Sequence, residues 1–154
     1  MKTIIIYEST HHGNTKKLVD AIAKKYEVDT IDVANQAEIE LGQYDVIGFA
    51  SGICFSKFYE KITALAMKKL TMKKQVFFLY SCANNNKDFS ESIKQIALEK
   101  GCHVLGTYGC KGFNTYGPLK LIGGMNKNHP NQEELDDAVR FFEDCMKKAG
   151  DRNE

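Results

Sequence analysis

Short apolar runs recur along the chain and alternate with segments of helical periodicity. The runs cover residues 3–7, 28–33, 46–50, 76–80 and 103–108. They are apolar at almost every position rather than at alternate ones, which is typical of strands that are covered on both faces. The pattern therefore predicts five strands in the interior of a parallel sheet.

Between the runs, apolar residues return every three or four positions, as on the buried face of an amphipathic helix. These helical segments begin near Thr15, Lys57, Asp88 and Asn131. Gly101 favours the end of the third helix, and Asn131 with Glu134 has the spacing of a capping box at the start of the fourth. Residues 32–44 have weak periodicity, and we expect a short helix or an irregular crossover there.

The alternation of strands and helices predicts right-handed crossovers and a parallel sheet with helices on both faces. The 154 residues are enough for one domain, which we assign to residues 1–150, and too few for two. In a three-layer α/β sandwich of this kind, a ligand lies at the carboxyl ends of the strands. The loops that follow Tyr7, Ala50, Tyr80 and Tyr108 are therefore the candidates for a binding site.

The composition excludes several classes of protein. The chain is 43% hydrophobic and 27% charged, with 21 basic and 20 acidic residues and a formal net charge of +1. This balance gives no support for nucleic-acid binding, which is usually accompanied by a strong basic excess. No apolar run approaches the roughly 20 residues that span a bilayer, so we expect no membrane segment.

The cysteines show no disulfide or zinc pattern. Their number is odd, no C-x-x-C pair is present, and they stand at Cys54, Cys82, Cys102, Cys110 and Cys145. With no recognisable leader, this favours reduced thiols and a cytoplasmic protein. Cys54, Cys82 and Cys110 each fall near the end of a strand. A thiol redox role and small-residue packing are both open there, and we favour packing.

The loop after the first strand, residues 8–15, has the composition of a phosphate-binding turn. Ser9, Thr10, Asn14 and Thr15 supply short polar side chains, and Gly13 allows a tight turn into the next helix, whose N-terminus presents N–H groups to an anion. The loop contains no Lys, no Arg and no Walker pattern, which favours a phosphate monoester over a nucleoside triphosphate. An ordinary Ser/Thr-capped helix start is the alternative.

Several segments resemble the flavodoxin family. The sequence I-I-I-Y-E-S-T-H-H-G-N-T-K-K-L at residues 4–18 resembles its phosphate loop, and residues 44–58 resemble its third strand and the flavin-flanking loop. Residues 109–118 and 123–130 resemble a short flavodoxin-like branch. The resemblance implies the flavodoxin fold, with a five-stranded parallel sheet of order 2-1-3-4-5. It also implies one non-covalent FMN and electron transfer between redox partner proteins.

Taken with the resemblance, four loops are predicted to form the FMN site. The phosphate is assigned to Ser9, Thr10, His12, Gly13, Asn14 and Thr15. An apolar wall against the flavin ring is assigned to Ser51, Gly52, Ile53, Cys54 and Phe55. The pyrimidine edge of the flavin is assigned to Ser81, Cys82, Ala83, Asn84 and Asn85. An aromatic cover over the flavin is assigned to Gly112, Phe113 and Tyr116.

Purely structural roles are open for several of these residues. Ile53 and Phe55 could pack into the core, and residues 81–86 could form a solvated loop that caps a helix. Phe113 or Tyr116 could cover only the edge of the sheet.

The chain departs from the flavodoxin pattern in several places. The first loop is one residue longer than in many flavodoxins, and we expect His11 on the surface. The loop after the fourth strand has three asparagines, at positions 84–86, where a stacking tyrosine is common. Cys54 falls near a glycine whose peptide flips on flavin reduction in many flavodoxins. The near-neutral charge contrasts with the usual acidic surface, and we interpret the lysines at positions 57, 61, 68, 69, 73 and 74 as a solvated helix face and turn.

The leading hypothesis is a monomeric, low-potential electron carrier that binds FMN and exposes one flavin edge to redox partner proteins. The alternative is a flavodoxin-like enzyme, such as a quinone reductase or a protoporphyrinogen oxidase, which needs room for a bulky substrate beside the flavin. A third hypothesis is a flavin-free interaction domain that has kept the fold. No separate nicotinamide-binding motif is visible, which favours the carrier.

Overall fold

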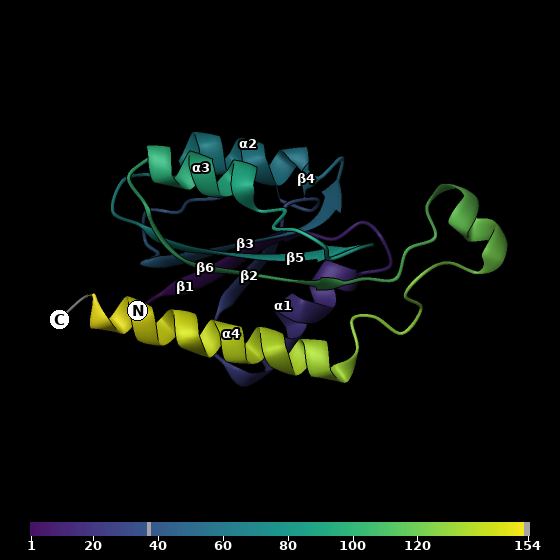
Figure 1. Ribbon diagram of the computed structural model, residues 1–154. Coiled ribbons are helices and arrows are strands. Elements are labelled where there is room, and N and C mark those ends of the chain that lie inside the picture. Colours follow the sequence, from purple (N-terminus) through teal and green to yellow (C-terminus); the bar gives the residue numbers. More distant parts are fainter. Residues whose placement is uncertain (37, 153–154) are drawn as a thin grey trace.

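Five parallel strands form the central sheet of the computed structural model, which describes residues 1–36 and 38–152 (Figure 1). The strands are β1 (Thr3–Glu8), β2 (Asp29–Asp32), β3 (Val46–Cys54), β5 (Gln75–Cys82) and β6 (His103–Lys111). They lie in the order β2-β1-β3-β5-β6, with all four pairings parallel. Counted without the short β4, this is the predicted order 2-1-3-4-5, and the predicted fold class is confirmed.

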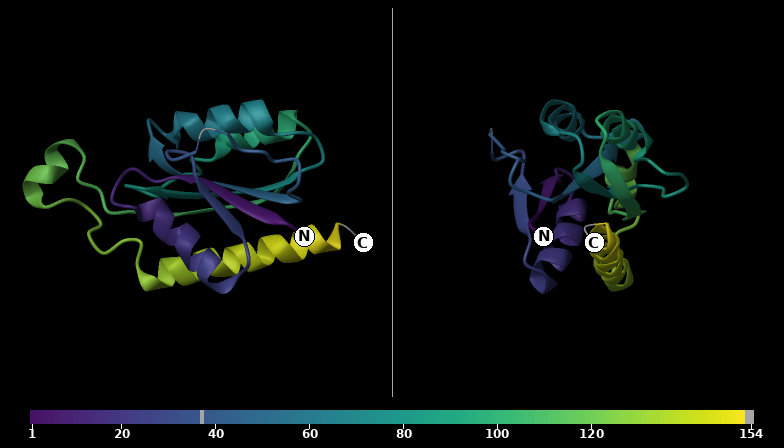
Figure 2. Two further views of the ribbon diagram at one scale, coloured as in Figure 1. Left: turned by 180° about the vertical axis from the view of Figure 1, so that it is seen from behind. Right: turned by 90° about the vertical axis from the view of Figure 1, so that its left-hand side faces the viewer.

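Helices cover both faces of the sheet, as predicted. On one face lie α1 (Asn14–Lys25) and α4 (Gln132–Asp151), and on the other lie α2 (Glu60–Lys69) and α3 (Glu91–Glu99) (Figures 1 and 2). Along β1, Ile4 and Ile6 join the core beneath α2 and α3, whereas Ile5 and Tyr7 join the core beneath α1 and α4. The apolar runs are nearly continuous because each central strand contributes side chains to two cores. Among the described residues, no helix is long and apolar enough to cross a membrane.

Local signals at the helix ends are confirmed. Gly101 has φ +73° and follows the end of α3, where its N–H donates to the carbonyl of Leu98. Asn131 and Glu134 form the predicted capping box at the start of α4, with each side chain accepting from the other residue's N–H.

Two elements differ from the predictions. The second helix was expected to begin near Lys57. It begins at Glu60 instead, because β4 (Lys57–Phe58) folds back antiparallel onto the end of β3. The short 3-10 helix η1 (Gly117–Ile122) was not expected. Residues 32–44 follow one of the two expectations, the irregular crossover: Asp32 ends β2, position 37 lies outside the described residues, and the others form turns and irregular backbone with no helix.

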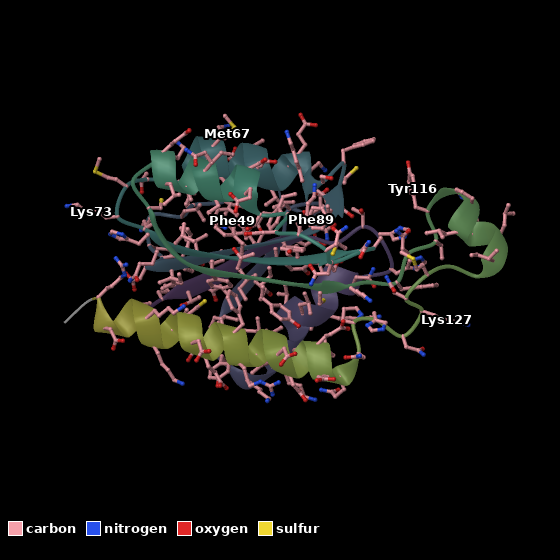
Figure 3. All side chains as sticks on the ribbon, in the orientation of Figure 1. Phe49, Met67, Lys73, Phe89, Tyr116 and Lys127 are labelled. Atoms are coloured by element: carbon pink, nitrogen blue, oxygen red, sulfur yellow. The ribbon has the colours of Figure 1, made fainter. Side chains whose placement is uncertain are left out.

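A long loop leaves the sheet at the carboxyl end of β6 and returns to α4. This segment, the 112–130 loop, extends beyond the end of the sheet (Figures 1 and 2). Its two arms are joined by reciprocal backbone hydrogen bonds between Asn114 and Met125, of 2.8 and 2.7 Å. Tyr116 and Lys127 lie on this loop, at the opposite end of the molecule from Lys73 (Figure 3).

Candidate functional site

A pocket of about 360 Å³ lies at the carboxyl ends of β1, β3, β5 and β6, where the sequence predicted a site. It brings together most of the predicted residues: Ser9, Thr10, Asn14, Thr15, Gly52, Ile53, Cys54, Phe55, Ser81, Cys82, Ala83, Gly112, Phe113 and Tyr116. The predicted residues that do not line this pocket are His12, Gly13, Ser51, Asn84 and Asn85. The lining comes from all four predicted loops, because the carboxyl ends of parallel strands meet at one edge of the sheet.

The first loop turns into α1 at Gly13, whose φ of +65° lies in the left-handed region that favours glycine. Ser9 Oγ accepts a hydrogen bond of 3.1 Å from the N–H of Lys16 in the first turn of α1. Deeper in the pocket, the buried hydroxyls of Thr15 and Ser81 share a hydrogen bond of 2.8 Å. The loop therefore places hydroxyls beside the N-terminus of a 12-residue helix, an arrangement that suits an anion.

Asn14 fastens the 112–130 loop to the first loop. Its Nδ2 donates to the carbonyl of Phe113 at 2.8 Å, and its Oδ1 accepts from the N–H of Phe113 at 3.2 Å. A Cβ on Gly112 would lie 2.6 Å from Asn14 Nδ2, so this close approach requires glycine. The side chain of Asn14, which was assigned to the phosphate, is thus engaged with the protein backbone.

The two histidines have roles opposite to those expected. His11 was expected on the surface, but it is half-buried and lines the pocket, and its Nε2 accepts from the N–H of Thr115 at 3.2 Å. Burial, and then the neighbouring His12, lower the pKa of His11, which favours this neutral acceptor form. His12 is exposed, shares a 2.8 Å hydrogen bond with Thr115 Oγ1 and packs its ring against Phe113.

Several predicted residues support the site from outside the lining. Ser51 is fully buried, and its Oγ accepts from the N–H of Tyr59 at 2.8 Å. Asn85 Nδ2 donates to the carbonyl of Gly109 at 2.9 Å and so ties the loop after β5 to β6. Asn84 lines an adjoining open hollow that shares Ile53, Phe55, Cys82 and Ala83 with the main pocket.

Tyr59 lines the pocket although no sequence pattern marked it, and Asn114, from the loop expected to cover the flavin, lines it as well. Tyr59 directly precedes α2, and its ring lies so close to Gly52 that a Cβ there would be 2.3 Å from the Tyr59 hydroxyl. The helical periodicity from Lys57 onward predicted a helix there, so Tyr59 was not expected at the site. The four aromatic residues of the lining are Phe55, Tyr59, Phe113 and Tyr116.

The hairpin between β3 and β4 carries an unusual turn at the pocket mouth. Cys54 pairs with Lys57, so the turn consists of Phe55 and Ser56, with φ values of +49° and +63°. Positive φ at both positions defines a type I′ turn, which usually contains Asn-Gly or Gly-Gly. Cys54, which was expected near the glycine whose peptide flips in many flavodoxins, lies in the strand and has no positive φ; the two residues after it have positive φ instead. Phe55 is 95% exposed, so it does not pack into the core.

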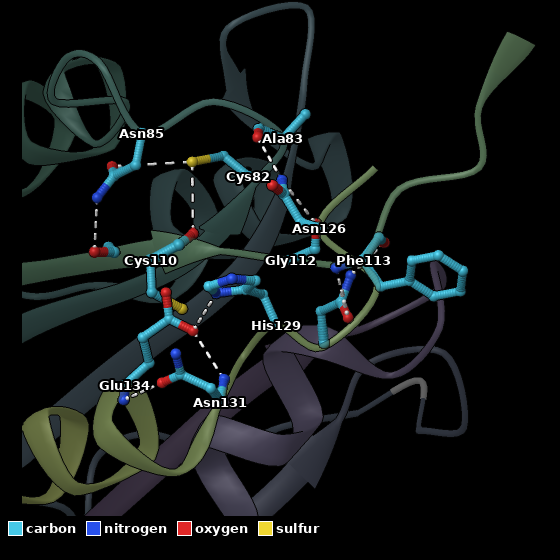
Figure 4. A network of polar contacts seen from close by, with 12 residues as sticks. Cys82, Ala83, Asn85, Cys110, Gly112, Phe113, Asn126, His129, Asn131 and Glu134 are labelled. Atoms are coloured by element: carbon cyan, nitrogen blue, oxygen red, sulfur yellow. Dashed lines mark hydrogen bonds and ion pairs between the residues drawn. The ribbon is translucent and has the colours of Figure 1, made fainter. Parts of the chain in front are cut away.

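The cysteines at the strand ends differ in environment. Cys82 and Cys110 are buried, and Cys82 Sγ donates toward the carbonyl of Cys110 at 3.4 Å (Figure 4). Burial raises the pKa of Cys82 to about 11 and also raises the pKa of Cys110, which keeps both thiols protonated. These two residues therefore serve as packing groups, whereas Cys54 is exposed at the pocket mouth.

Asn126 joins the 112–130 loop to the floor of the site (Figure 4). Its Nδ2 donates to the carbonyl of Ala83 at 2.6 Å and to the carbonyl of Gly112 at 3.3 Å. At the end of the loop, His129 Nδ1 and Glu134 Oε2 are 2.8 Å apart, which links it to the capping box of α4. The loop is therefore anchored at both ends next to the pocket.

Comparison with known proteins agrees with this geometry. The chain is 35% identical over 150 residues to an uncharacterized protein of Methanocaldococcus jannaschii, covering 96% of this chain and 99% of the relative. A flavodoxin from the domain Archaea is similar in structure, with a TM-score of 0.70, 20% identity and coverage of 97% and 99% of the two chains. A Fusobacterium nucleatum flavodoxin mutant bound to flavin mononucleotide has a TM-score of 0.66, 18% identity and coverage of 96% and 97%. The family model of the flavodoxin domain matches residues 4–106, and the chain belongs to the flavodoxin domain family.

Proposed function

We propose that the protein binds one FMN in this pocket and carries electrons between redox partner proteins of the cytoplasm. The observation that carries the proposal is the pocket itself, which combines an anion-suited helix N-terminus with aromatic walls at the carboxyl edge of the sheet. Its volume of about 360 Å³ falls within the usual range of ligand pockets, about 300–1,000 Å³. The FMN-bound flavodoxin of similar structure supports the choice of ligand.

The donor set of the pocket fits the two ends of FMN. Ser9, Thr10 and the first turn of α1 would hold the phosphate, with the Thr15–Ser81 hydroxyl pair beneath it. Ile53, Phe55 and Tyr59 offer apolar surface to the flavin ring. The backbone of the loop after β5 would meet the polar edge of the ring.

When bound, FMN supplies the one- and two-electron redox chemistry, which no side chain of this site provides. The protein's residues bind and orient it. The apolar walls would exclude water from one side of the ring, and the buried hydroxyls would lie beneath the phosphate. The exposed Phe55 and Tyr116 mark the side from which a partner would approach.

The first test is a titration of the FMN-free protein with FMN, followed by the quenching of flavin fluorescence, with riboflavin as the comparison ligand. We expect FMN to bind with 1:1 stoichiometry and more tightly than riboflavin, because only FMN carries the phosphate. The loaded protein, once reduced by dithionite, should pass electrons to a protein acceptor. Absence of flavin binding would leave the flavin-free interaction domain as the function.

A second candidate, a quinone reductase, is favoured by the adjoining hollow of about 380 Å³. It shares Ile53, Phe55, Cys82 and Ala83 with the main pocket, and it offers space for a planar molecule beside a bound flavin. Steady-state turnover of NAD(P)H with a quinone by the isolated, FMN-loaded protein would support the enzyme. Reduction by dithionite without such turnover would support the carrier.

A further inference from the structure

Six lysines lie on the strands, helix and loops next to the pocket at the carboxyl edge of the sheet. We call this set the lysine rim: Lys57, Lys61, Lys87, Lys111, Lys120 and Lys127. All six are exposed, and they come from β4, α2, the loop after β5, the end of β6 and the 112–130 loop. Within the described part of the chain, none of their ammonium groups has a carboxylate within 4 Å. The rim therefore keeps its positive charge available to an external partner.

Some acidic side chains near the rim are buried or already paired, whereas Asp32, whose charge acts on Glu8, is partly exposed at the end of β2. Glu8 is only 7% exposed, and Asp88 bonds Lys94 at 2.7 Å. Glu60, in the first turn of α2, is an exposed carboxylate beside the rim. Residues 111–130 contain three lysines and no Asp or Glu, whereas α4 carries seven acidic and three basic residues. The net charge of +1 thus conceals a local excess of lysine on the 112–130 loop.

Lys69 and Lys74, which were interpreted together with Lys57 and Lys61 as one solvated face, lie farther from the pocket and bind other parts of the protein. Lys69 bonds Glu40 at 3.2 Å, and Lys74 donates to the carbonyl of Tyr44 at 2.6 Å. Both side chains hold the segment between β2 and β3 against the body of the protein. Only the members near the carboxyl edge of the sheet belong to the rim.

Exposed apolar side chains stand among the rim lysines. We call them the apolar tip: Phe55, Tyr116, Leu121 and Ile122, with exposed fractions of 95%, 79%, 89% and 77%. Phe55 and Tyr116 also line the pocket, and Leu121 and Ile122 lie on η1 of the 112–130 loop. Apolar groups within a charged border are typical of a surface that buries against another protein.

We propose that the pocket mouth is a docking surface for an acidic redox protein, one whose redox centre is surrounded by carboxylates. The proposal rests on the proposed electron-carrier function and adds the chemistry of the partner. The apolar tip would provide close contact, and the lysine rim would steer and orient the encounter. A twofold contact between two copies of this chain would set the rim against itself, so like charges disfavour a second copy. A lipid surface would satisfy the charge but would bring no redox centre to the pocket.

The test compares two haem proteins of opposite charge as probes: cytochrome b5, which is acidic, and cytochrome c, which is basic. Their binding to the FMN-loaded and the FMN-free protein is measured from amide chemical-shift changes at about 0.01 and about 0.1 M salt, where the Debye length is about 30 and about 10 Å. We expect preferential binding of cytochrome b5, with shifts at the rim and the tip, and weaker binding at the higher salt. In the FMN-loaded protein reduced by dithionite, each ferric haem takes up one electron, and the transfer rate should show the same salt dependence.

Two charge-matched double variants locate the docking surface. Lys120→Glu with Lys127→Glu reverses charge on the rim, and Lys68→Glu with Lys73→Glu makes the same net change at the other end of the molecule. At low salt the rim variant should lose at least about tenfold in association rate with cytochrome b5, and the control should stay within about twofold. A third double variant, Leu121→Ser with Ile122→Ser, should weaken binding equally at both salt concentrations.

The outcomes separate this proposal from the proposed function. Docking of cytochrome b5 by a protein that binds no FMN would overturn the carrier function and not the docking surface. If the protein binds FMN but binds both haem proteins with equal affinity, the proposed acidic partner is wrong. Equal losses of association rate with cytochrome b5 in the rim and control variants would have the same meaning. Rim-dependent binding to phosphatidylserine vesicles without cytochrome b5 binding would assign the surface to a membrane. Self-association in sedimentation equilibrium that the rim variant abolishes would assign it to a second copy.

Discussion

We predict that the turn formed by Phe55 and Ser56 lowers the free energy of unfolding and places an aromatic side chain at the pocket mouth. Both residues have positive φ, and neither is a residue that tolerates this region well. The perturbation is the double variant Phe55→Asn with Ser56→Gly, which installs the pair that type I′ hairpins prefer. It should stabilise the fold and weaken FMN binding.

The magnitude follows from the geometry of the turn. Left-handed backbone costs a residue with a side chain about 1–2 kcal/mol, so the two positions together carry about 2–4 kcal/mol. Two effects reduce this gain: glycine at position 56 costs about 0.5–1 kcal/mol through the greater freedom of the unfolded chain, and asparagine at position 55 relieves only part of the strain there because it still has a Cβ. Phe55 is 95% exposed, so its removal loses little burial within the FMN-free protein. The net gain in the free energy of unfolding should be about 1–2 kcal/mol, or about 2–8 °C in Tm.

The assay is urea unfolding of the FMN-free protein, analysed by linear extrapolation with the slope m compared between variants. Cys54→Gly is the matched control, because position 54 lies in β3 without positive φ. A glycine there should destabilise by about 0.5–1 kcal/mol. FMN affinity is measured on the same samples by flavin fluorescence.

A loss of stability in the double variant, or an equal gain from Cys54→Gly, would refute the assignment of strain to positions 55 and 56. Greater stability with unchanged FMN affinity would show that the strain is present but that Phe55 is no wall of the flavin site. Both results together, greater stability and weaker binding, would identify a trade between stability and function at this turn.

Three further predictions test the site and its surroundings. Thr15→Val should lower FMN affinity about tenfold or more and riboflavin affinity much less, and Thr30→Val on β2 is the control. Equal losses of affinity for FMN and riboflavin would contradict a role of Thr15 in binding the phosphate. Ellman's reagent should rapidly label one thiol of the folded protein, that of Cys54. Cys54→Ser should abolish this labelling, and bound FMN should slow it. Rapid labelling of a second thiol would contradict the burial of the other four cysteines. Burial raises the pKa of Glu8 above its ordinary value of 4.5, so the folded state binds this proton more tightly and loses stability as the pH rises from about 4.5 through the folded pKa. Glu8→Gln should flatten that decline in urea unfolding, and an identical pH profile for Glu8→Gln and the exposed control Glu27→Gln would contradict it.

The sequence by itself determined the layers of the fold. The apolar runs at residues 3–7 and 76–80 lie in strands that are buried along their whole length, and only the interior of a two-faced sheet buries such runs completely. Gly101 and the Asn131–Glu134 pair marked helix ends correctly, because capping chemistry acts within a few residues. Residues of the 8–15 loop line the pocket at the carboxyl edge of the sheet, where the alternation of strands and helices predicted a site.

Only the tertiary structure decided which side chains share the site and where charge gathers. Asn14 and Phe113 are 99 residues apart in sequence and are joined because β1 and β6 end at the same edge of the sheet. Tyr59 lines the pocket because it directly follows the strand β4, which pairs with β3. A strand of two residues is too short to show a periodic pattern in the sequence. The lysine rim gathers residues from five separate segments, so a net charge of +1 gave no sign of it. Such contacts depend on strand order and loop path, which are set by the packing of the whole chain and not by any local pattern of residues.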